Sequence, residues 1–505
     1  MSNSTATSRI FSASLANWVG IGVSLLTQIV FVPIFLSHWS AEIYGVWLLL
    51  LSFLGFAGLI QGAHRDFIYH ESLKLGKNNL EQVCLQLSSA LPLVVLSSFI
   101  VFLIVYFQFE YSIIDVSFGL DEALKEDFLF SAMMLALVLF VVGNYYGFLL
   151  GPVVLLGYYP FITWLKVGIA FFTSIVPVIV VMFDGQLTDA VIGLVASTFI
   201  AKLVAIFWVL RLYKKENIQL PKPNFKLGLM QFARSAWILA KYVSDTFRQT
   251  GIRFLITPFL GSAAVAQFAT NRTIANVAQQ GITSLVGPIL PELMRYAHER
   301  KQVEVQATLA LLWIMLCFVI APGFIVLQLL IEPFFEVWTR GAIEFDSVLF
   351  VTLSSSILVM ILAQPADSIL RGNNLYKIQL SISVMALVCL VFIIYIFSNS
   401  LGVLAAGAGL FVSETLVLCL SVWKAQEWMQ KRELRWPWQY FLLSLFSVGL
   451  TLIALILIAY EIEPFISAGV VLTLQFAVAI KFWQLMPSLA KEKAYRLLNK
   501  IGVRK

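Results

Sequence analysis

Charged side chains stand inside the long apolar segments of this sequence, and they are the residues whose chemistry the rest of the chain must accommodate. At the centre of a membrane helix each costs at least about 2.5 kcal/mol, so such a residue normally faces a partner or a polar cavity. Six of the nine that we single out are cationic, and this surplus predicts an anionic ligand such as phosphate or diphosphate. The nine are Lys166, Lys202, Lys241, Asp245, Arg248, Arg253, Arg272, Asp367 and Glu414.

The seventh apolar segment carries the densest charge. Arg234, Lys241, Asp245 and Arg248 are spaced 7, 4 and 3 residues apart, which places them on one helical face within an arc of roughly 60°. Asp245 can pair with Lys241 and with Arg248. An internal salt-bridge ladder is the alternative to a cavity lining, but one carboxylate cannot satisfy three cations. We therefore predict that Lys241 and Arg248 bind substrate, and that Asp245 pairs with them or takes part in ion coupling. Arg253 points away from this face, and we expect it to snorkel to the outer interface.

The eighth apolar segment has a second polar stripe. Arg272, Asn276 and Gln279 share one face at spacings of 4 and 3 residues. We predict that these three residues also contact substrate. Hydrogen bonding between helices, at about 0.6 kcal/mol per bond, is the alternative for the two amides.

Two further carboxylates are candidates for ion coupling. Asp367 stands four residues before Arg371, so a simple ion pair is the alternative. Glu414 has no charged neighbour within its own turn, only the hydroxyls of Ser413 and Thr415, and it is therefore the stronger candidate for a protonatable carboxyl.

The second apolar segment closes with His64 and Arg65. We predict that Arg65 meets a diphosphate group at the inner leaflet, and a basic interfacial anchor is the alternative. Lys166 and Lys202, in the fifth and sixth segments, are interpreted as snorkelling side chains.

The elements that position these residues follow from composition. Of 505 residues 60% are hydrophobic and 12% are charged, and the mean hydropathy is +0.89. Soluble domains carry about 25% charged residues, so a soluble enzyme is excluded and an all-α polytopic membrane protein is predicted. About fourteen transmembrane helices are expected, at 10–36, 43–62, 83–107, 128–150, 159–183, 187–210, 232–259, 262–290, 306–331, 348–370, 377–397, 401–423, 437–459 and 464–486.

Loop charge gives the sidedness. If the N-terminus is cytoplasmic, the cytoplasmic segments hold 25 basic residues and the outward loops hold two, Lys125 and Arg340. This asymmetry predicts that both termini are cytoplasmic. It also accounts for the net charge of +6, which is therefore no sign of nucleic-acid binding.

The two halves of the chain resemble each other weakly. Pro33–Leu36 and Pro258–Gly261 end the first and seventh segments, and turns at Gly157 and Gly372 follow the fourth and tenth. Six helices per half predict parallel repeats. The expected organisation is a first half at 1–213, a linker at 214–231, a second half at 232–425, two additional helices at 436–486 and a basic amphipathic cytoplasmic tail at 487–505.

Several of these features resemble the polysaccharide flippases of the multidrug/oligosaccharidyl-lipid/polysaccharide exporter (MOP) superfamily. They are Gln28 with Pro33, the Ala41–Trp47 start of the second segment, the Leu-x-Gly turns at Gly157 and Gly372, and the plan of two six-helix halves with two extra helices. The acidic-Leu-Gly-Leu stretch that many family members carry in helix two is replaced here by the sequence at 56–66.

The resemblance implies a flippase that moves an isoprenoid-diphosphate-linked oligosaccharide, such as an O-antigen or capsule repeat unit, across the bacterial inner membrane. The implied partners are the undecaprenyl-diphosphate-type substrate, membrane lipids and a glycan polymerase. The sequence has no nucleotide, metal or other enzyme motif, so neither enzymatic activity nor a cofactor is expected. A multidrug-type cation antiporter and a lipid II flippase are the alternatives on the same fold, and a non-transport subunit of a glycan-assembly complex is the third.

Overall fold

The protein is built almost entirely of long helices. The computed structural model describes residues 6–111, 120–143, 145–286, 293, 296–297, 299–373 and 375–492. These described residues contain no β-strand, which confirms the predicted all-α class. The end of the predicted amphipathic tail, from 493 onward, lies outside them.

The candidate membrane spans agree with the predicted plan. In the described residues, twelve helices are long and apolar enough to cross a membrane, or thirteen with a bent pair counted as one span. One of the twelve, Phe225–Val277, has 53 residues, which would measure about 80 Å if straight, against a hydrocarbon core of about 30 Å. It is interrupted at Gly261, whose backbone is non-helical (φ 78°, ψ 177°). The turn predicted between the seventh and eighth helices lies at this residue, and the stretch is long enough for two crossings.

The chain forms two compact units, which we call unit 1 and unit 2. Unit 1 comprises Met1–Ala266 with Trp338–Ala342, and unit 2 comprises Gln267–Val337 with Ile343–Lys505. Unit 1 contains α1 (Ala6–His38), α2 (Ala41–Ala57), α3 (Leu59–Leu75), η1 (Lys77–Asn79), α4 (Leu80–Tyr111), α5 (Glu122–Val141), α6 (Tyr145–Phe148), α7 (Leu150–Leu155), α8 (Tyr159–Met182), α9 (Leu187–Lys215), α10 (Phe225–Thr246), the π-helical turn η2 (Phe247–Gly251) and the first part of α11 (Ile252–Val286).

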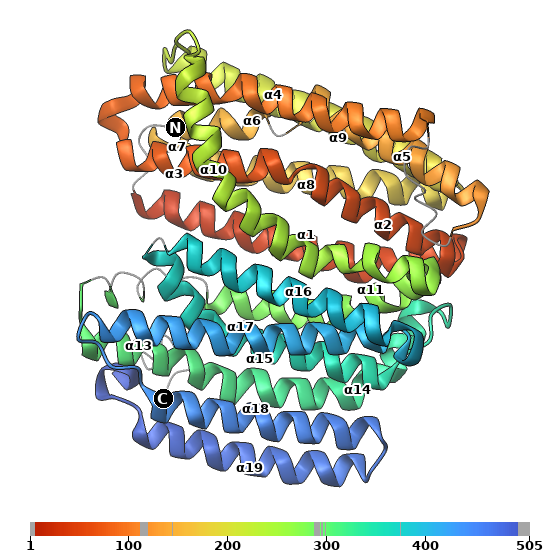
Figure 1. Ribbon diagram of the computed structural model, residues 1–505, viewed down its shortest axis with the longest axis vertical. Coiled ribbons are helices and arrows are strands. Elements are labelled where there is room, and N and C mark those ends of the chain that lie inside the picture. The colour runs from red at the N-terminus through yellow and green to blue at the C-terminus, as the bar shows by residue number, and fades with distance from the viewer. Residues whose placement is uncertain are drawn as a thin grey trace. The chain divides into compact units, whose positions relative to one another are not determined.

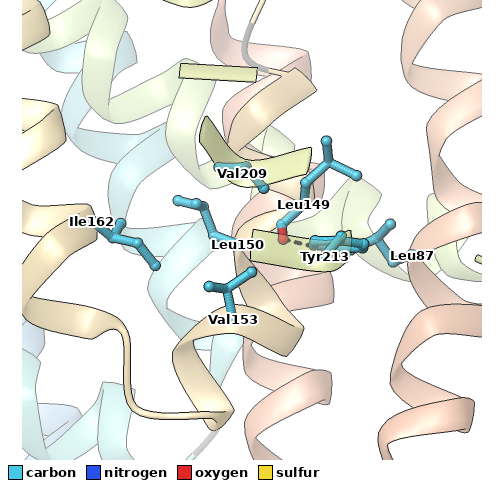
Figure 2. Packing of buried hydrophobic residues seen from close by; sticks show 7 residues of the cluster. All are labelled: Leu87, Leu149, Leu150, Val153, Ile162, Val209 and Tyr213. Carbon is cyan, nitrogen blue, oxygen red and sulfur yellow. Dashed lines mark hydrogen bonds between the residues drawn. The ribbon is translucent and has the colours of Figure 1, made fainter. Parts of the chain in front are cut away.

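Helices of unit 1 pack as long neighbours, α1 on α8, α8 on α9, α4 on α5, and α10 on both α3 and α4 (Figure 1). Side chains of α4, α7, α8 and α9 meet in one apolar cluster, and the Tyr213 hydroxyl buried there donates a hydrogen bond to the Leu149 carbonyl at 2.8 Å (Figure 2). Because the phenol is satisfied, burying it costs little. The cluster consists of Leu87, Leu149, Leu150, Val153, Ile162, Val209 and Tyr213.

Unit 2 contains the rest of α11, α13 (Gln302–Met315), the π-helical turn η3 (Leu316–Ile320), α14 (Ala321–Thr339) except its last two residues, α15 (Ser347–Gly372), α16 (Tyr376–Leu401), α17 (Leu404–Gln430), α18 (Trp438–Ala459) and α19 (Pro464–Leu485). α17 packs on α15 and α16, and α18 packs on α15 and α19. The buried Gln475 amide of α19 donates to Thr451 Oγ1 (2.5 Å) and to the Ser447 carbonyl (3.2 Å) of α18. These bonds hold the two additional helices together inside the apolar unit.

The second predicted helix is broken. α2 ends at Gly58, and the chain bends by 41° into α3. α3 then continues to Leu75, well beyond the predicted end at 62. His64 and Arg65 therefore lie along α3, and the prediction that they close the second helix was wrong.

Candidate functional site

The charged stripe predicted for the seventh helix runs along α10 into η2. Lys241 Nζ lies 2.6 Å from Asp245 Oδ2, and Arg248 Nη2 lies 3.6 Å from Asp245 Oδ1. Both pairs predicted from the spacing are therefore formed. The Arg248 side chain is 8% exposed, and it comes from the π-helical turn, a type of turn that is frequent at functional sites. One carboxylate thus holds two cationic side chains on the same face.

The face that α10 turns toward α3 and α4 is made of small and polar residues. Gly228, Gln231, Ser235 and Ser244 are buried, whereas Leu229, Met230 and Trp237 are exposed. This reverses the pattern of a soluble helix and is typical of a membrane helix that packs on its neighbours through small residues.

Arg65 is held by its chain neighbour. Its Nε and Nη2 each lie 3.0 Å from Asp66 Oδ1, and the other Asp66 oxygen accepts a hydrogen bond from the Tyr242 hydroxyl of α10 at 3.2 Å. The guanidinium stem also passes Gly147, where a Cβ would lie 2.8 Å from Arg65 Cδ. Arg65 is therefore fixed at the contact between α3, α6 and α10.

Two lysines join this arginine. Lys166 on α8 and Lys202 on α9 are within electrostatic reach of Arg65, and Asp66 also acts on Lys166. Lys166 is exposed and Lys202 is half-buried, and snorkelling of these two side chains stays a prediction. We call Arg65, Lys166 and Lys202 the cationic cluster of unit 1.

His64 completes the seam between α3 and α10. Its ring is buried among Phe67, Phe148 and Phe232, and its Nδ1 lies 2.9 Å from the Ser235 hydroxyl of α10. This seam, the contact of His64 on α3 with Ser235 on α10, joins residues that are 171 positions apart in the chain.

Arg253 does not snorkel. Its Nη1 donates to the Leu48 carbonyl at 3.1 Å and to the Ser52 hydroxyl at 3.0 Å, both on α2. The prediction of an outward-pointing side chain was wrong because a buried helix neighbour offers two acceptors within reach, and hydrogen bonds to a charged donor are strong.

The remaining predicted substrate contacts lie on the part of α11 that belongs to unit 2. The guanidinium of Arg272 lies 5.8 Å from the centre of the Phe268 ring, a cation–π contact. Gln279 Nε2 lies 3.7 Å from the Met360 sulfur of α15. Asn276 is half-buried on the same helix.

The two carboxylates of unit 2 differ in their surroundings. Asp367 is paired with Arg371 at 2.5 Å and accepts a hydrogen bond from Gln379 Nε2 at 2.9 Å, so the simple ion pair that was the alternative at this position is formed. Glu414 on α17 is 2% exposed, at a helix that packs closely on α15.

Sequence reasoning missed Asp66 and Tyr242. Asp66 follows Arg65 directly, and pairing between chain neighbours has no periodic signal. Tyr242 directly follows Lys241 on α10. An aromatic residue in an apolar segment is usually interpreted as a packing residue, so its hydrogen bond gave no signal. Among the described residues, three or more His, Cys, Asp or Glu side chains never gather closely enough to hold a metal ion.

No protein-family model matches this chain, and no curated protein is similar to it in sequence. Its structure is similar to an inward-facing multidrug resistance MATE family transporter of the MOP superfamily, with a TM-score of 0.61 and 12% identity over 81% of this chain and 95% of that one. It is also similar to the lipid II flippase MurJ in an inward closed conformation, with a TM-score of 0.58 and 13% identity over 96% of this chain and 99% of that one. The chain has the fold of the MOP-superfamily transporters.

A third MOP-superfamily transporter, from Pyrococcus furiosus, has a TM-score of 0.56 and 11% identity over 84% of this chain and 95% of that one. It is described as having a binding pocket of reverse polarity that suggests a different function. The structures differ in the share of this chain that they match.

The lipid II flippase matches 96% of this chain. The 4% that it leaves unmatched is shorter than α18 and α19 together, which have 22 residues each. That flippase therefore matches at least part of the two additional helices.

Proposed function

We propose that this protein is a flippase that translocates an isoprenoid-diphosphate-linked oligosaccharide across the bacterial inner membrane by alternating access. The observation that carries the proposal is the cationic cluster: Lys166 and Lys202 lie within electrostatic range of Arg65, while Asp66 pairs with Arg65 and also interacts with Lys166. A diphosphate matches such a cluster, because guanidinium binds phosphate oxygens in a bidentate fork and ammonium groups act as point charges.

The stripe on α10 and η2 offers a second set of cations. Asp245 holds Lys241 and Arg248 in place, and an entering phosphate or acidic sugar competes with this carboxylate for the same donors. Substrate binding therefore exchanges one set of charge-assisted hydrogen bonds for another and leaves no cation uncompensated. In unit 2 we assign Arg272, Asn276 and Gln279 to contacts with the sugars.

The helix plan supports a flippase over a drug transporter. Three MATE structures leave 14%, 16% and 19% of this chain unmatched, whereas the lipid II flippase leaves 4%. The structure described as a lipid II flippase thus matches at least part of the two additional helices α18 and α19.

We assign ion coupling first to Glu414. Asp367 already has Arg371 and Gln379 as partners, and Asp245 is committed to the α10 stripe. Glu414 is buried on α17, and carboxylates that face the interior of a membrane helix bundle are typical of proton and ion pathways. Glu414→Gln should abolish the dependence of transport on the ion gradient, and Asp367→Asn should reduce transport without changing that dependence.

A multidrug-type cation antiporter is the second candidate, favoured by the fold of the MATE structures. A cationic cluster repels organic cations, so the charge of unit 1 argues against it. A lipid II flippase shares the diphosphate group, and charge does not separate it from our proposal. A non-transport subunit of a glycan-polymerising assembly is the third candidate, and a glycan polymerase is a proposed partner of the flippase as well.

The deciding experiment is deletion of the gene in its source organism, with analysis of the surface glycan and of the lipid-linked pool. Loss of surface polysaccharide with undecaprenyl-linked repeat units accumulating on the inner leaflet supports the proposal. Cell lysis with accumulated lipid II identifies the lipid II flippase instead. An intact surface glycan with increased retention of cationic dyes identifies the drug antiporter. Lost polymer with normally flipped repeat units identifies the assembly subunit.

A further inference from the structure

A proline in α1 leaves one backbone carbonyl without its helical donor. In an α-helix the Ile29 carbonyl would accept from the N–H of residue 33, but residue 33 is proline and has no N–H. Inside an apolar helix packing, an unsatisfied carbonyl is costly. The indole of Trp338 supplies the missing donor, with Nε1 at 2.5 Å from the Ile29 oxygen.

Trp338 belongs to a short strap, Trp338–Ala342, which consists of the last two residues of α14 and the first three of the connection to α15. The strap is part of unit 1, although the residues before and after it in the chain belong to unit 2. Trp338 is 5% exposed and Thr339 is fully buried. The turn is closed by the Ala342 N–H, which donates to the Thr339 carbonyl at 3.0 Å, and it uses positive φ angles at Arg340 (54°) and Gly341 (69°).

The end of α1 does not need the strap for its own packing. Phe35, Trp39, Tyr44 and Trp47 form a cluster of rings between α1 and α2, with centroids 5.1–6.1 Å apart. The Trp39 indole also donates to the Gly185 carbonyl at 3.0 Å. These contacts fix the last turns of α1 independently of Trp338, so the strap can leave without unfolding the helix.

We propose that the strap is a releasable latch that closes on the outer end of α1 through the Trp338 indole and the carbonyl that Pro33 frees. Both the end of α1 and the strap fall on the outward side of the predicted topology, the side at which the substrate would leave. The inference rests on the proposed alternating-access transport and adds to it a contact that forms and breaks at each cycle. When the strap is released, the hydrogen bond between the Trp338 indole and the Ile29 carbonyl is replaced by hydrogen bonds to water. The net free-energy change is small, so release can be reversed in every cycle.

The test measures release of the strap directly. Thr339→Cys places a thiol at a fully buried strap position, and its reaction rate with a membrane-impermeant maleimide reports opening. The background carries Cys389→Ala and Cys419→Ala, because these native thiols are the accessible ones. Ser37→Cys, at an exposed position at the end of α1, is the matched control whose rate should not change.

Trp338→Phe keeps the ring and removes the N–H donor. We expect it to raise the labelling rate at position 339 roughly two- to tenfold. In a Pro33→Ala background, residue 33 can donate to the Ile29 carbonyl, so Trp338→Phe should have little further effect. Pro33→Ala alone should also raise the rate, because its N–H competes with the indole.

An unchanged rate in Trp338→Phe, or the same increase with and without Pro33→Ala, would overturn the latch. If Trp338→Phe fails to accumulate, Pro33→Ala decides alone, and an unchanged rate in that variant has the same meaning. None of these readouts involves a substrate, so the latch can fail while the flippase proposal stands, and the reverse.

Discussion

The Tyr242 hydroxyl of α10 and the Asp66 carboxylate of α3 are joined by a hydrogen bond of 3.2 Å, while the other oxygen of Asp66 accepts twice from Arg65. The three side chains form a relay in which α10 orients a carboxylate and the carboxylate orients a guanidinium. An arginine held in this way is preorganised for an anion, because little side-chain freedom remains to be lost on binding.

Tyr242→Phe removes the α10 end of this relay. We expect a loss of about 1 kcal/mol in the free energy of unfolding, the usual net value of one hydrogen bond. We also expect weaker substrate binding, since Arg65 is less well oriented. Thermal unfolding of the purified protein and transport in cells measure the two effects. Tyr460→Phe, at an exposed position, is the control and should change neither.

Alanine substitutions of Arg248 and Arg253 should have different effects, one on transport and the other on stability. Arg248→Ala removes a cation from the proposed site, and we expect transport to be lost at normal abundance. Arg253→Ala instead removes the donor shared by the Ser52 hydroxyl and the Leu48 carbonyl, which keep the hydrogen bond between each other. We expect it to destabilise unit 1 by about 1–3 kcal/mol and to lower abundance in the membrane. Quantitative immunoblotting beside a transport assay separates the two, and equal abundance of both variants would contradict the assignment.

Substitutions of Lys202 test whether the cationic cluster takes part in transport. Lys202→Gln removes its charge and should reduce transport by at least tenfold, whereas Lys202→Arg should restore most of it. Lys214→Gln, on the same helix at an exposed position, should have no effect. Full transport by Lys202→Gln would remove the cluster from the mechanism.

Local periodicity explains what could be predicted from the sequence. The pairs that Asp245 makes with Lys241 and Arg248 depend only on spacings of 4 and 3 residues along one helix, and they formed as predicted. The turn at Gly261 was also predictable, because an apolar stretch of this length must reverse to stay within a bilayer.

Contacts between distant helices could not be predicted in the same way. The partner of Tyr242 is 176 residues away, and those of Arg253 are more than 200 residues away. A single sequence gives the composition of a helix face but not the neighbour that the face meets. Gly58 shows a related limit, because a glycine within an apolar run gives no sign of whether the helix continues or bends.

Close packing of α10 against α4 gives the last prediction. A Cβ at Gly228 would lie 2.2 Å from the Ser89 carbonyl oxygen, a backbone atom that cannot move aside. The neighbouring Asn224 N–H donates to the Ser89 hydroxyl at 3.0 Å and fixes the same approach. Gly228→Ala should therefore force the helices apart at a cost of about 1–3 kcal/mol.

Because Gly228 lies on the helix that carries Ser235 and Tyr242, the displacement should also weaken the contacts with His64 and Asp66 and so reduce transport. Gly449→Ala in α18 is the matched control, since a Cβ added there would meet no atom within 4 Å, and alanine stabilises a helix interior by roughly 0.5–1 kcal/mol relative to glycine. Thermal unfolding of both variants, with transport measured in parallel, checks the prediction. A Gly228→Ala protein as stable and active as Gly449→Ala would mean that α10 can move away from α4 freely, and that its seam with α3 does not position the site.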